Sequence, residues 1–267
     1  MPDLVSLENQ VALITGAASG FGRALAERLA PLGVLLVLGD LSETGGAQLA
    51  NQLNAAFPSA TTGQPRCVFQ KTDVTTRDLH ALFDLAQTQY GRLDIVVNNA
   101  GIGDSQAFHE NTTDAWKPVL EIDLTAVIQG CRLALTSFLT HGRQGTILNV
   151  SSLAGLYPQP LQPVYAAAKA GVLHLTQSLA GYAPGVRAVA VCPGFAPTGI
   201  TAAARATLGS EQYAAMTAGQ EITVAAVVDA MMWALRDPAG VPGGAYIRIT
   251  RQQGTEVFVG RQRLARL

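Results

Sequence analysis

The sequence predicts an α/β protein built on a doubly wound parallel sheet, and three observations support this prediction. Short apolar runs rich in β-forming residues alternate with longer segments of helical period. The runs are nearly continuous in apolar residues, as strands buried on both faces of a parallel sheet require. No Pro/Ser-rich linker, charge block or repeat divides the 267 residues, so residues 1–267 are predicted to form a single domain.

The apolar runs predict seven strands, and the segments between them have helical period and lengths that suit crossover connections. The expected strands are Val11–Thr15, Val34–Gly39, Cys67–Gln70, Leu93–Val97, Thr146–Val150, Ala188–Cys192 and Ala245–Ile249. The expected helices are Gly20–Leu32, Glu43–Ala56, Thr76–Tyr90, Thr113–Leu139, Val164–Gly181 and Thr223–Arg236. A seven-stranded parallel sheet with helices on both faces follows. Ligands of such sheets bind beyond the carboxyl ends of the strands.

Composition favours an oligomeric protein and argues against nucleic-acid binding. Hydrophobic residues make up 48% of the chain and charged residues 14%, which provides a large core and apolar surface for contacts between subunits. The net charge of −1, without long runs of Lys or Arg, argues against nucleic-acid binding. Residues Met1–Gln10 lack the pattern of a secretory signal, and no charge-free segment of about 20 apolar residues predicts a membrane span.

The cysteines are expected to be reduced core residues of a cytoplasmic protein. Cys67, Cys131 and Cys192 are odd in number, far apart and without CxxC spacing, so neither a disulfide framework nor a metal site is predicted.

The first strand ends in a glycine-rich turn, Thr15–Gly22, that leads into a helix. Glycines there allow a tight turn and let backbone N–H groups approach a pyrophosphate at the positive end of the helix. An ordinary strand-to-helix turn is the alternative interpretation. The cofactor-binding candidates in this turn are Gly16, Ser19, Phe21 and Gly22.

The second strand is followed by Asp40 and Leu41. A carboxylate at this place accepts hydrogen bonds from the adenosine ribose hydroxyls and repels a 2′-phosphate. Because neither Leu41 nor Ser19 is basic, NAD is favoured over NADP. Asp40 could instead cap the helix that begins near Glu43.

Two further strand ends carry residues that suit the same crevice. Asp73 and Val74 follow the third strand and are placed to hold the adenine edge, although Asp73 alone is explained equally well as a helix cap. The fourth strand ends in Asn98–Gly101, a turn of small residues in which Asn99 is a candidate cofactor contact.

A Ser, a Tyr and a Lys after the fifth strand form a candidate catalytic set. Tyr165 and Lys169 are four residues apart, so both lie on one face of a helix. A phenol has a pKa of about 10, and a nearby ammonium favours the phenolate, which makes Tyr165 a usable base. Ser152 can hold the substrate oxygen while charge develops on it. Taken alone, a Tyr and a Lys at this spacing often make a half-buried helix face.

Together these motifs resemble the short-chain dehydrogenase/reductase family over nearly the whole chain. The matching elements are TGxxxGxG at Thr15–Gly22, NNAG at Asn98–Gly101, the Ser152, Tyr165 and Lys169 set, and Pro193-Gly194. The resemblance implies a Rossmann-type domain that assembles as a dimer or tetramer through the two long helices Thr113–Leu139 and Val164–Gly181. It also implies that Tyr165 and Lys169 contact the nicotinamide ribose, and that Pro193 and Thr198 lie at the carboxamide.

One position departs from the family pattern. Where the family often has an Asn that supports a water linked to Lys169, this sequence has Asp123. Asp123 is therefore a candidate member of the catalytic set, and its charge could equally raise the pKa of Lys169.

The likeness is greatest to the NAD-dependent, 15-hydroxyprostaglandin dehydrogenase-like members of the family. It lies in Ser151–Leu156, Gln162–Tyr165, Cys192–Phe195 and Gly244–Thr250. By this resemblance Ser152, Gln162 and Phe195 bind the substrate, Gln162 hydrogen-bonds the reacting hydroxyl, and the substrate is an apolar secondary alcohol. Gln162 as an ordinary loop residue is the alternative.

Two further segments, residues 198–220 and the C-terminal tail, give less specific predictions. Residues 198–220 are expected to form a substrate lid, with Leu208, Tyr213 and Met216 as its larger apolar residues. The tail Gln252–Leu267, which contains Arg261, Arg263 and Arg266, is expected to be solvated or to bridge subunits, with an anion site as the alternative.

The sequence as a whole predicts an NAD-dependent oxidoreductase acting on a hydrophobic secondary alcohol or ketone. An NADPH-linked carbonyl reductase is the alternative within enzymes. A dinucleotide-binding regulator without turnover is a third interpretation. It predicts that Ser152, Tyr165 or Lys169 is missing, whereas all three are present.

Overall fold

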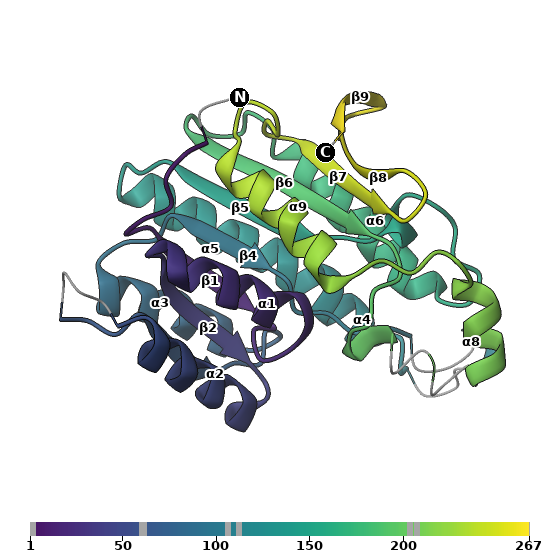
Figure 1. The fold of residues 1–267 in the computed structure, drawn as a ribbon, viewed down its shortest axis with the longest axis horizontal. Coiled ribbons are helices and arrows are strands. Elements are labelled where there is room, and N and C mark those ends of the chain that lie inside the picture. Colours follow the sequence, from purple (N-terminus) through teal and green to yellow (C-terminus); the bar gives the residue numbers. More distant parts are fainter. Residues whose placement is uncertain are drawn as a thin grey trace.

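A single sheet lies at the centre of the protein, between helices on its two faces (Figure 1), and it has nine strands over the residues that the structure describes. The computed structural model describes residues 4–58, 63–104, 108–110, 114–201, 205 and 209–266. Within these residues the strand order is β3-β2-β1-β4-β5-β6-β7-β8-β9. The strands are β1 Val11–Thr15, β2 Leu35–Asp40, β3 Cys67–Lys71, β4 Ile95–Asn98, β5 Gly145–Val150, β6 Val186–Pro193, β7 Ala245–Thr250, β8 Gly254–Val259 and β9 Gln262–Arg266. The order reverses between β1 and β4, as in a doubly wound Rossmann-type fold.

The seven predicted strands are all present and pair in parallel, but the sheet continues beyond them. The tail forms β8 and β9, which are antiparallel to their neighbours, so the expected count of seven strands was too low. Most tail side chains are exposed, as expected of a solvated end, but Thr255, Glu256 and Val257 are buried. Val257 of β8 is fully buried against the core, and the buried carboxylate of Glu256 is ion-paired with Arg248 and Arg263. Burial of the consecutive side chains of Thr255, Glu256 and Val257 therefore holds β8 on the sheet.

Helices cover both faces of the sheet (Figure 1). They are α1 Gly20–Leu29, α2 Glu43–Ala56, α3 Asp78–Tyr90, α4 Lys117–Leu120, α5 Ala126–Thr140, α6 Pro163–Ser178, α8 Ser210–Thr217 and α9 Val224–Arg236. One buried cluster joins α1, α2 and α9 to the sheet, and another joins α3, α5 and α6 to the opposite face.

The alternation of side chains along β1 explains why the strands are continuous apolar runs in the sequence. Ala12 and Ile14 lie in the first cluster, whereas Val11 and Leu13 lie in the second. Since successive strand residues point to opposite faces, a strand between two helical layers buries every side chain.

The long helical run Lys117–Thr140 contains a feature that the sequence did not predict. Its expected first residue, Thr113, lies outside the described residues, and Glu121–Thr125 form a π-helical turn between α4 and α5. By length and composition this run could cross a membrane, but core helices can have the same length and composition. In this protein 39% of its most apolar stretch is buried. Here Val127, Cys131 and Ala134 are buried with α3 and α6 on one face of the sheet, which is a core-helix arrangement.

Candidate active site

A cavity of about 750 Å³ lies at the carboxyl ends of the parallel strands. Every predicted site residue lines it except Gly22 and Asp123, which lie just behind its wall. The predicted residues that do line it are Gly16, Ser19, Phe21, Asp40, Leu41, Asp73, Val74, Asn99, Ser152, Gln162, Tyr165, Lys169, Pro193, Phe195 and Thr198. The fold thus gathers side chains from strand ends far apart in the sequence around one space.

The glycine-rich turn adopts a conformation that only small residues allow. Gly16 and Gly20 have φ values of +64° and +53°, in the region that favours glycine. A Cβ on Gly22 would overlap the carbonyl oxygen of Gly16 and lie 2.6 Å from Asn99 Nδ2. Ser19 is the N-cap of α1, and its side chain makes no capping hydrogen bond. The N-terminus of α1 therefore presents backbone donors to the cavity at close range.

Asp40 connects the end of β2 to this turn. Its Oδ2 accepts a hydrogen bond from the Ala18 N–H at 2.9 Å, and its Oδ1 accepts one from the Ser42 N–H at 2.8 Å. The N-cap of α2 is Ser42, whose Oγ accepts from the Gly45 N–H, so Asp40 is not that cap. Each carboxylate oxygen keeps a second lone pair that can accept a hydrogen bond from a hydroxyl group.

Asp73 and Val74 line the cavity beside Asp40 and Leu41. Asp73 also makes a local turn, because its Oδ1 accepts from the N–H and the hydroxyl of Thr75 at 2.9 and 2.7 Å. The N-cap of α3 is Arg77, so the interpretation of Asp73 as a helix cap was wrong, and Asp73 forms a local turn at the cavity instead.

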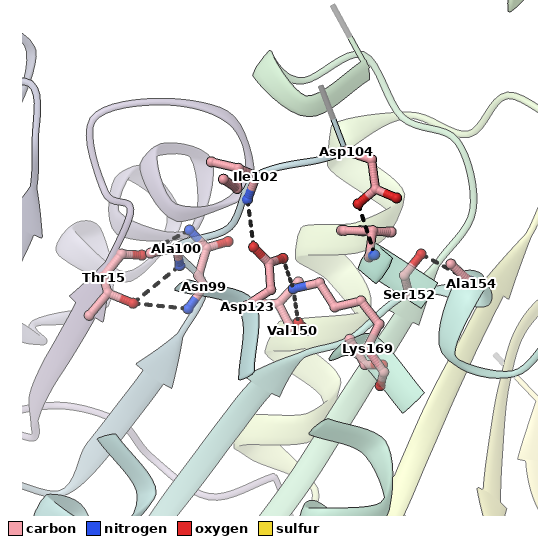
Figure 2. Close-up of polar contacts among 12 residues, drawn as sticks. Thr15, Asn99, Ala100, Ile102, Asp104, Asp123, Val150, Ser152, Ala154 and Lys169 are labelled. Atoms are coloured by element: carbon pink, nitrogen blue, oxygen red, sulfur yellow. Dashed lines mark hydrogen bonds and ion pairs between the residues drawn. The ribbon is translucent and has the colours of Figure 1, made fainter. Parts of the chain in front are cut away.

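Asn99 joins two strand ends, as Figure 2 shows. Its Nδ2 donates to the carbonyl oxygens of Thr15 and Gly16 at 2.9 and 3.0 Å. Thr15 Oγ1 in turn accepts from the N–H groups of Asn99 and Ala100. The Asn99 amide thus holds the glycine-rich turn in place, and Thr15 is a supporting residue that the sequence did not single out.

Tyr165 and Lys169 lie on one face of α6, with Lys169 Nζ 5.5 Å from the centre of the Tyr165 ring. Burial raises the pKa of Tyr165; Lys169 opposes this shift, Asp123 adds to it, and the net shift is upward. The ammonium alone therefore does not lower the phenol pKa as the sequence suggested, because burial and a second charge act against it. Ser152 Oγ accepts from the Ala154 N–H at 3.1 Å, which fixes its position at the cavity wall.

Asp123 lies between Lys169 and the backbone of Ile102, as Figure 2 shows. Its Oδ2 is 2.9 Å from Lys169 Nζ, and the two side chains are 0% and 3% exposed. Its Oδ1 accepts from the Ile102 N–H at 2.8 Å, while Lys169 Nζ donates to the Val150 carbonyl oxygen at 3.1 Å. Burial lowers the pKa of Lys169, but the Asp123 carboxylate and Tyr165 together raise it by more than burial lowers it, so the net shift is upward.

Asp104 is a site residue that sequence reasoning missed. Its Oδ2 accepts from the Val164 N–H at 3.1 Å and its Oδ1 from the Tyr165 N–H at 3.0 Å. Gln162, the N-cap residue of α6, makes no side-chain capping bond, so a carboxylate from the loop after β4 caps this helix. The signal available was its place shortly after the Asn98–Gly101 turn, at a strand end that faces the cavity.

The end of the cavity beside Ser152 and Gln162 is lined by several large apolar side chains. Its polar groups include Ser152 and Gln162, and a Cβ on Gly103 would lie 2.8 Å from Gln162 Nε2. Its larger apolar lining residues are Leu153, Tyr157, Phe195, Ile200 and Tyr213. Tyr213 comes from α8 in the predicted lid, whereas Leu208 and the side chain of Met216 lie outside the described residues.

The opposite end fits a dinucleotide. The glycine-rich turn leaves room for backbone approach, the helix N-terminus offers donors to a pyrophosphate, and Asp40 offers acceptors to ribose hydroxyls. Thr198 lies against this turn, since a Cβ on Gly20 would contact its methyl group at 3.6 Å. A cofactor seated there would extend toward Tyr165 and Lys169 along one continuous cavity.

Comparison with known proteins agrees with this geometry. A family profile described as short chain dehydrogenase matches residues 10–209. The chain is 39% identical over 248 residues to cis-4-hydroxycyclohexanecarboxylate dehydrogenase of Sinomonas cyclohexanicum, covering 90% of this chain and 94% of that protein. It is 40% identical over 201 residues to human 15-hydroxyprostaglandin dehydrogenase [NAD(+)], covering 73% and 71%.

A solved structure gives the same result. A short-chain dehydrogenase/reductase from Burkholderia phymatum, in complex with NAD, superposes with a TM-score of 0.75 at 30% identity, covering 86% of this chain and 87% of that one. Because the profile and two relatives of high coverage agree with the fold, the chain belongs to the short-chain dehydrogenase/reductase family of oxidoreductases.

Proposed function

We propose that this protein is an NAD-dependent dehydrogenase that interconverts a hydrophobic secondary alcohol and its ketone. The observation that carries the proposal is the single cavity that joins the glycine-rich turn and Asp40 at one end to Ser152, Tyr165 and Lys169 at the other. The relatives named as dehydrogenases of hydroxy compounds, and the one named with NAD(+), support the same reaction class.

The chain's residues divide between holding the cofactor and moving a proton. Gly16, Ser19, Phe21 and Gly22 would surround the pyrophosphate, Asp40 and Leu41 the adenosine ribose, and Asp73 and Val74 the adenine, while Asn99 supports the turn. Tyr165 and Lys169 would hold the nicotinamide ribose, with Pro193 and Thr198 at the carboxamide. When bound, the nicotinamide supplies the hydride acceptor or donor.

In the oxidation direction, Tyr165 accepts the proton of the substrate hydroxyl as a hydride leaves the carbinol carbon. Ser152 donates a hydrogen bond to the substrate oxygen, where negative charge develops. Gln162 contacts the same hydroxyl, and Phe195 packs on the apolar body of the substrate. In the reduction direction the same phenol returns its proton to the carbonyl oxygen.

A panel of neutral secondary alcohols and ketones, assayed with NAD(H) and NADP(H), tests the proposal. We expect NADH formation from apolar alcohols, with a loss of at least about 100-fold in Tyr165→Phe. Tyr182→Phe is the matched control, because Tyr182 is an exposed phenol that does not line the cavity. Equal rates in wild type and Tyr165→Phe would remove Tyr165 from the reaction, and tighter binding of NADPH would refute the use of Asp40.

We also propose that the protein works in the cytoplasm as a dimer or tetramer. On α5, Ile128 and Leu139 are 45% and 54% exposed, which leaves apolar side chains on a helix that a partner subunit would cover. The three cysteines are buried and free, as in a reducing compartment. Light scattering at micromolar concentration tests the assembly, and a monomeric mass would contradict it.

A further inference from the structure

The catalytic Lys169 is not alone in its burial, because a carboxylate is buried with it. Asp123 Oδ2 lies 2.9 Å from Lys169 Nζ, and both side chains are almost completely inaccessible. A buried carboxylate is expensive unless it is paired and hydrogen-bonded, and here Oδ1 accepts from the Ile102 N–H while Oδ2 faces the ammonium. The two groups therefore form a pair of zero net charge.

This pair also fixes the lysine side chain. Lys169 Nζ contacts Asp123 on one side and donates to the Val150 carbonyl oxygen on the other. The ammonium is thus held from inside the protein by one hydrogen bond and one ion pair, at the wall of the cavity that Lys169 lines. The π-helical turn Glu121–Thr125 makes this possible, because it contains Asp123 as its fully buried residue.

We propose that Asp123 is a positioning residue that fixes Lys169 and shifts the proton exchange of Tyr165 to higher pH than Lys169 alone would set. The reasoning is electrostatic. An ammonium near the phenol favours the phenolate, but a carboxylate bonded to the same ammonium offsets that field. Tyr165 therefore receives only part of the help that an unpaired lysine would give. This inference rests on the proposed function, since it assigns the pH range of the same acid/base.

Other titratable groups around the pair do not take over this role. Tyr165 and Lys169 belong to α6, Cys192 to β6 and Asp104 to the loop after β4. Burial raises the pKa of Cys192 to about 12, so its thiol is neutral in the working range. Asp104 is committed to the N–H groups of Val164 and Tyr165, and its charge remains when Asp123 is replaced. The interactions of Tyr165 with Lys169 and Asp123 are of opposite sign, as the geometry requires.

Asp123→Asn is the decisive variant, because it removes the charge and keeps an oxygen for the Ile102 N–H. Glu121→Gln is the matched control, since Glu121 is an exposed acid in the same π-helical turn. Ionisation of Tyr165 is measured by ultraviolet difference titration, with each protein compared with its own Tyr165→Phe version to subtract the other five of the six tyrosines. We expect the Tyr165 titration to move down by about one pH unit in Asp123→Asn and to stay unchanged in Glu121→Gln.

The pH profile of kcat/KM for alcohol oxidation provides the second readout. Its rising limb should move down by about one pH unit in Asp123→Asn. Below that limb the variant should then be about 10-fold faster than wild type. A merely structural role would lower rate or stability and leave the limb in place. Coincident titration curves for Asp123→Asn and wild type, or a shift to higher pH, would overturn the inference. The titration needs no substrate, so failure of every alcohol would refute the proposed function and still leave the role of Asp123 decided.

Discussion

Removing the carboxylate of Asp104 should lower the stability of the protein and loosen the first turn of α6, the helix that carries Tyr165 and Lys169. Asp104 accepts from the N–H groups of Val164 and Tyr165 at 3.1 and 3.0 Å, within the first turn of α6. Loss of a helix cap costs about 0.5–2 kcal/mol, and hydrogen bonds to a charged group contribute about 1.5–3 kcal/mol each. Because Asp104 is only partly buried, water replaces part of this loss. We expect Asp104→Ala to lower the free energy of unfolding by about 2 kcal/mol.

The effect is measurable by thermal and urea unfolding. For a chain of this size, about 2 kcal/mol corresponds to a fall in Tm of about 4–8 °C. Asp104→Asn should lose roughly half as much, since its amide keeps a single acceptor oxygen for the two N–H groups. Asp229→Ala is the control, because Asp229 pairs with Arg28 on the surface and exposed pairs contribute about 1 kcal/mol or less.

Catalysis should fall with stability, for a geometric reason. One of the two N–H groups that Asp104 holds belongs to Tyr165 itself, and small displacements of a reacting group cost large factors in rate. We expect kcat to fall by about 10-fold in Asp104→Ala at a temperature where the variant is fully folded. Unchanged Tm together with unchanged kcat would show that Asp104 does not support the catalytic helix, and the reasoning would fail.

Three further outcomes follow from the same structure. Asp40→Ala should reduce the preference for NAD over NADP by about 10-fold or more in a binding titration, because it removes both an acceptor and a like charge; an unchanged preference would assign cofactor choice elsewhere. Gly22→Ala should abolish NAD binding and cost about 1–3 kcal/mol in urea unfolding, whereas a Cβ on Gly199 meets nothing within 4 Å and should be tolerated by the fold. The three buried cysteines, whose pKa values burial raises to about 11 or 12, should resist a thiol reagent at pH 8 until the protein unfolds. The unfolded thiols ionise near pH 9.0 and the buried ones do not, so stability should fall as the pH rises from 9.0 toward 12.

Local features of the sequence predicted most of the sheet and the two ends of the cavity. β1 has the expected bounds, and the other predicted strands differ from the observed ones by a few residues. Continuous apolar runs identify strands covered on both faces, and a spacing of four places Tyr165 and Lys169 on one helix face, whatever the rest of the chain does. The tail was harder, because β8 depends on pairing with β7 and on burial of Glu256 between Arg248 and Arg263.

By itself, the sequence determined the fold class and the glycine-rich turn, and it singled out Ser152, Tyr165 and Lys169 as the proposed catalytic residues, because local patterns of residues carry these predictions. Only the tertiary structure decided how those groups are charged and held. Asp123 meets Lys169 from 46 positions away, and Asp104 caps a helix that begins some 60 positions later. No local pattern encodes such pairs, since they form where separate strand ends and a π-helical turn converge. Burial at that place strengthens the electrostatic interactions between the charged groups that the fold brings together.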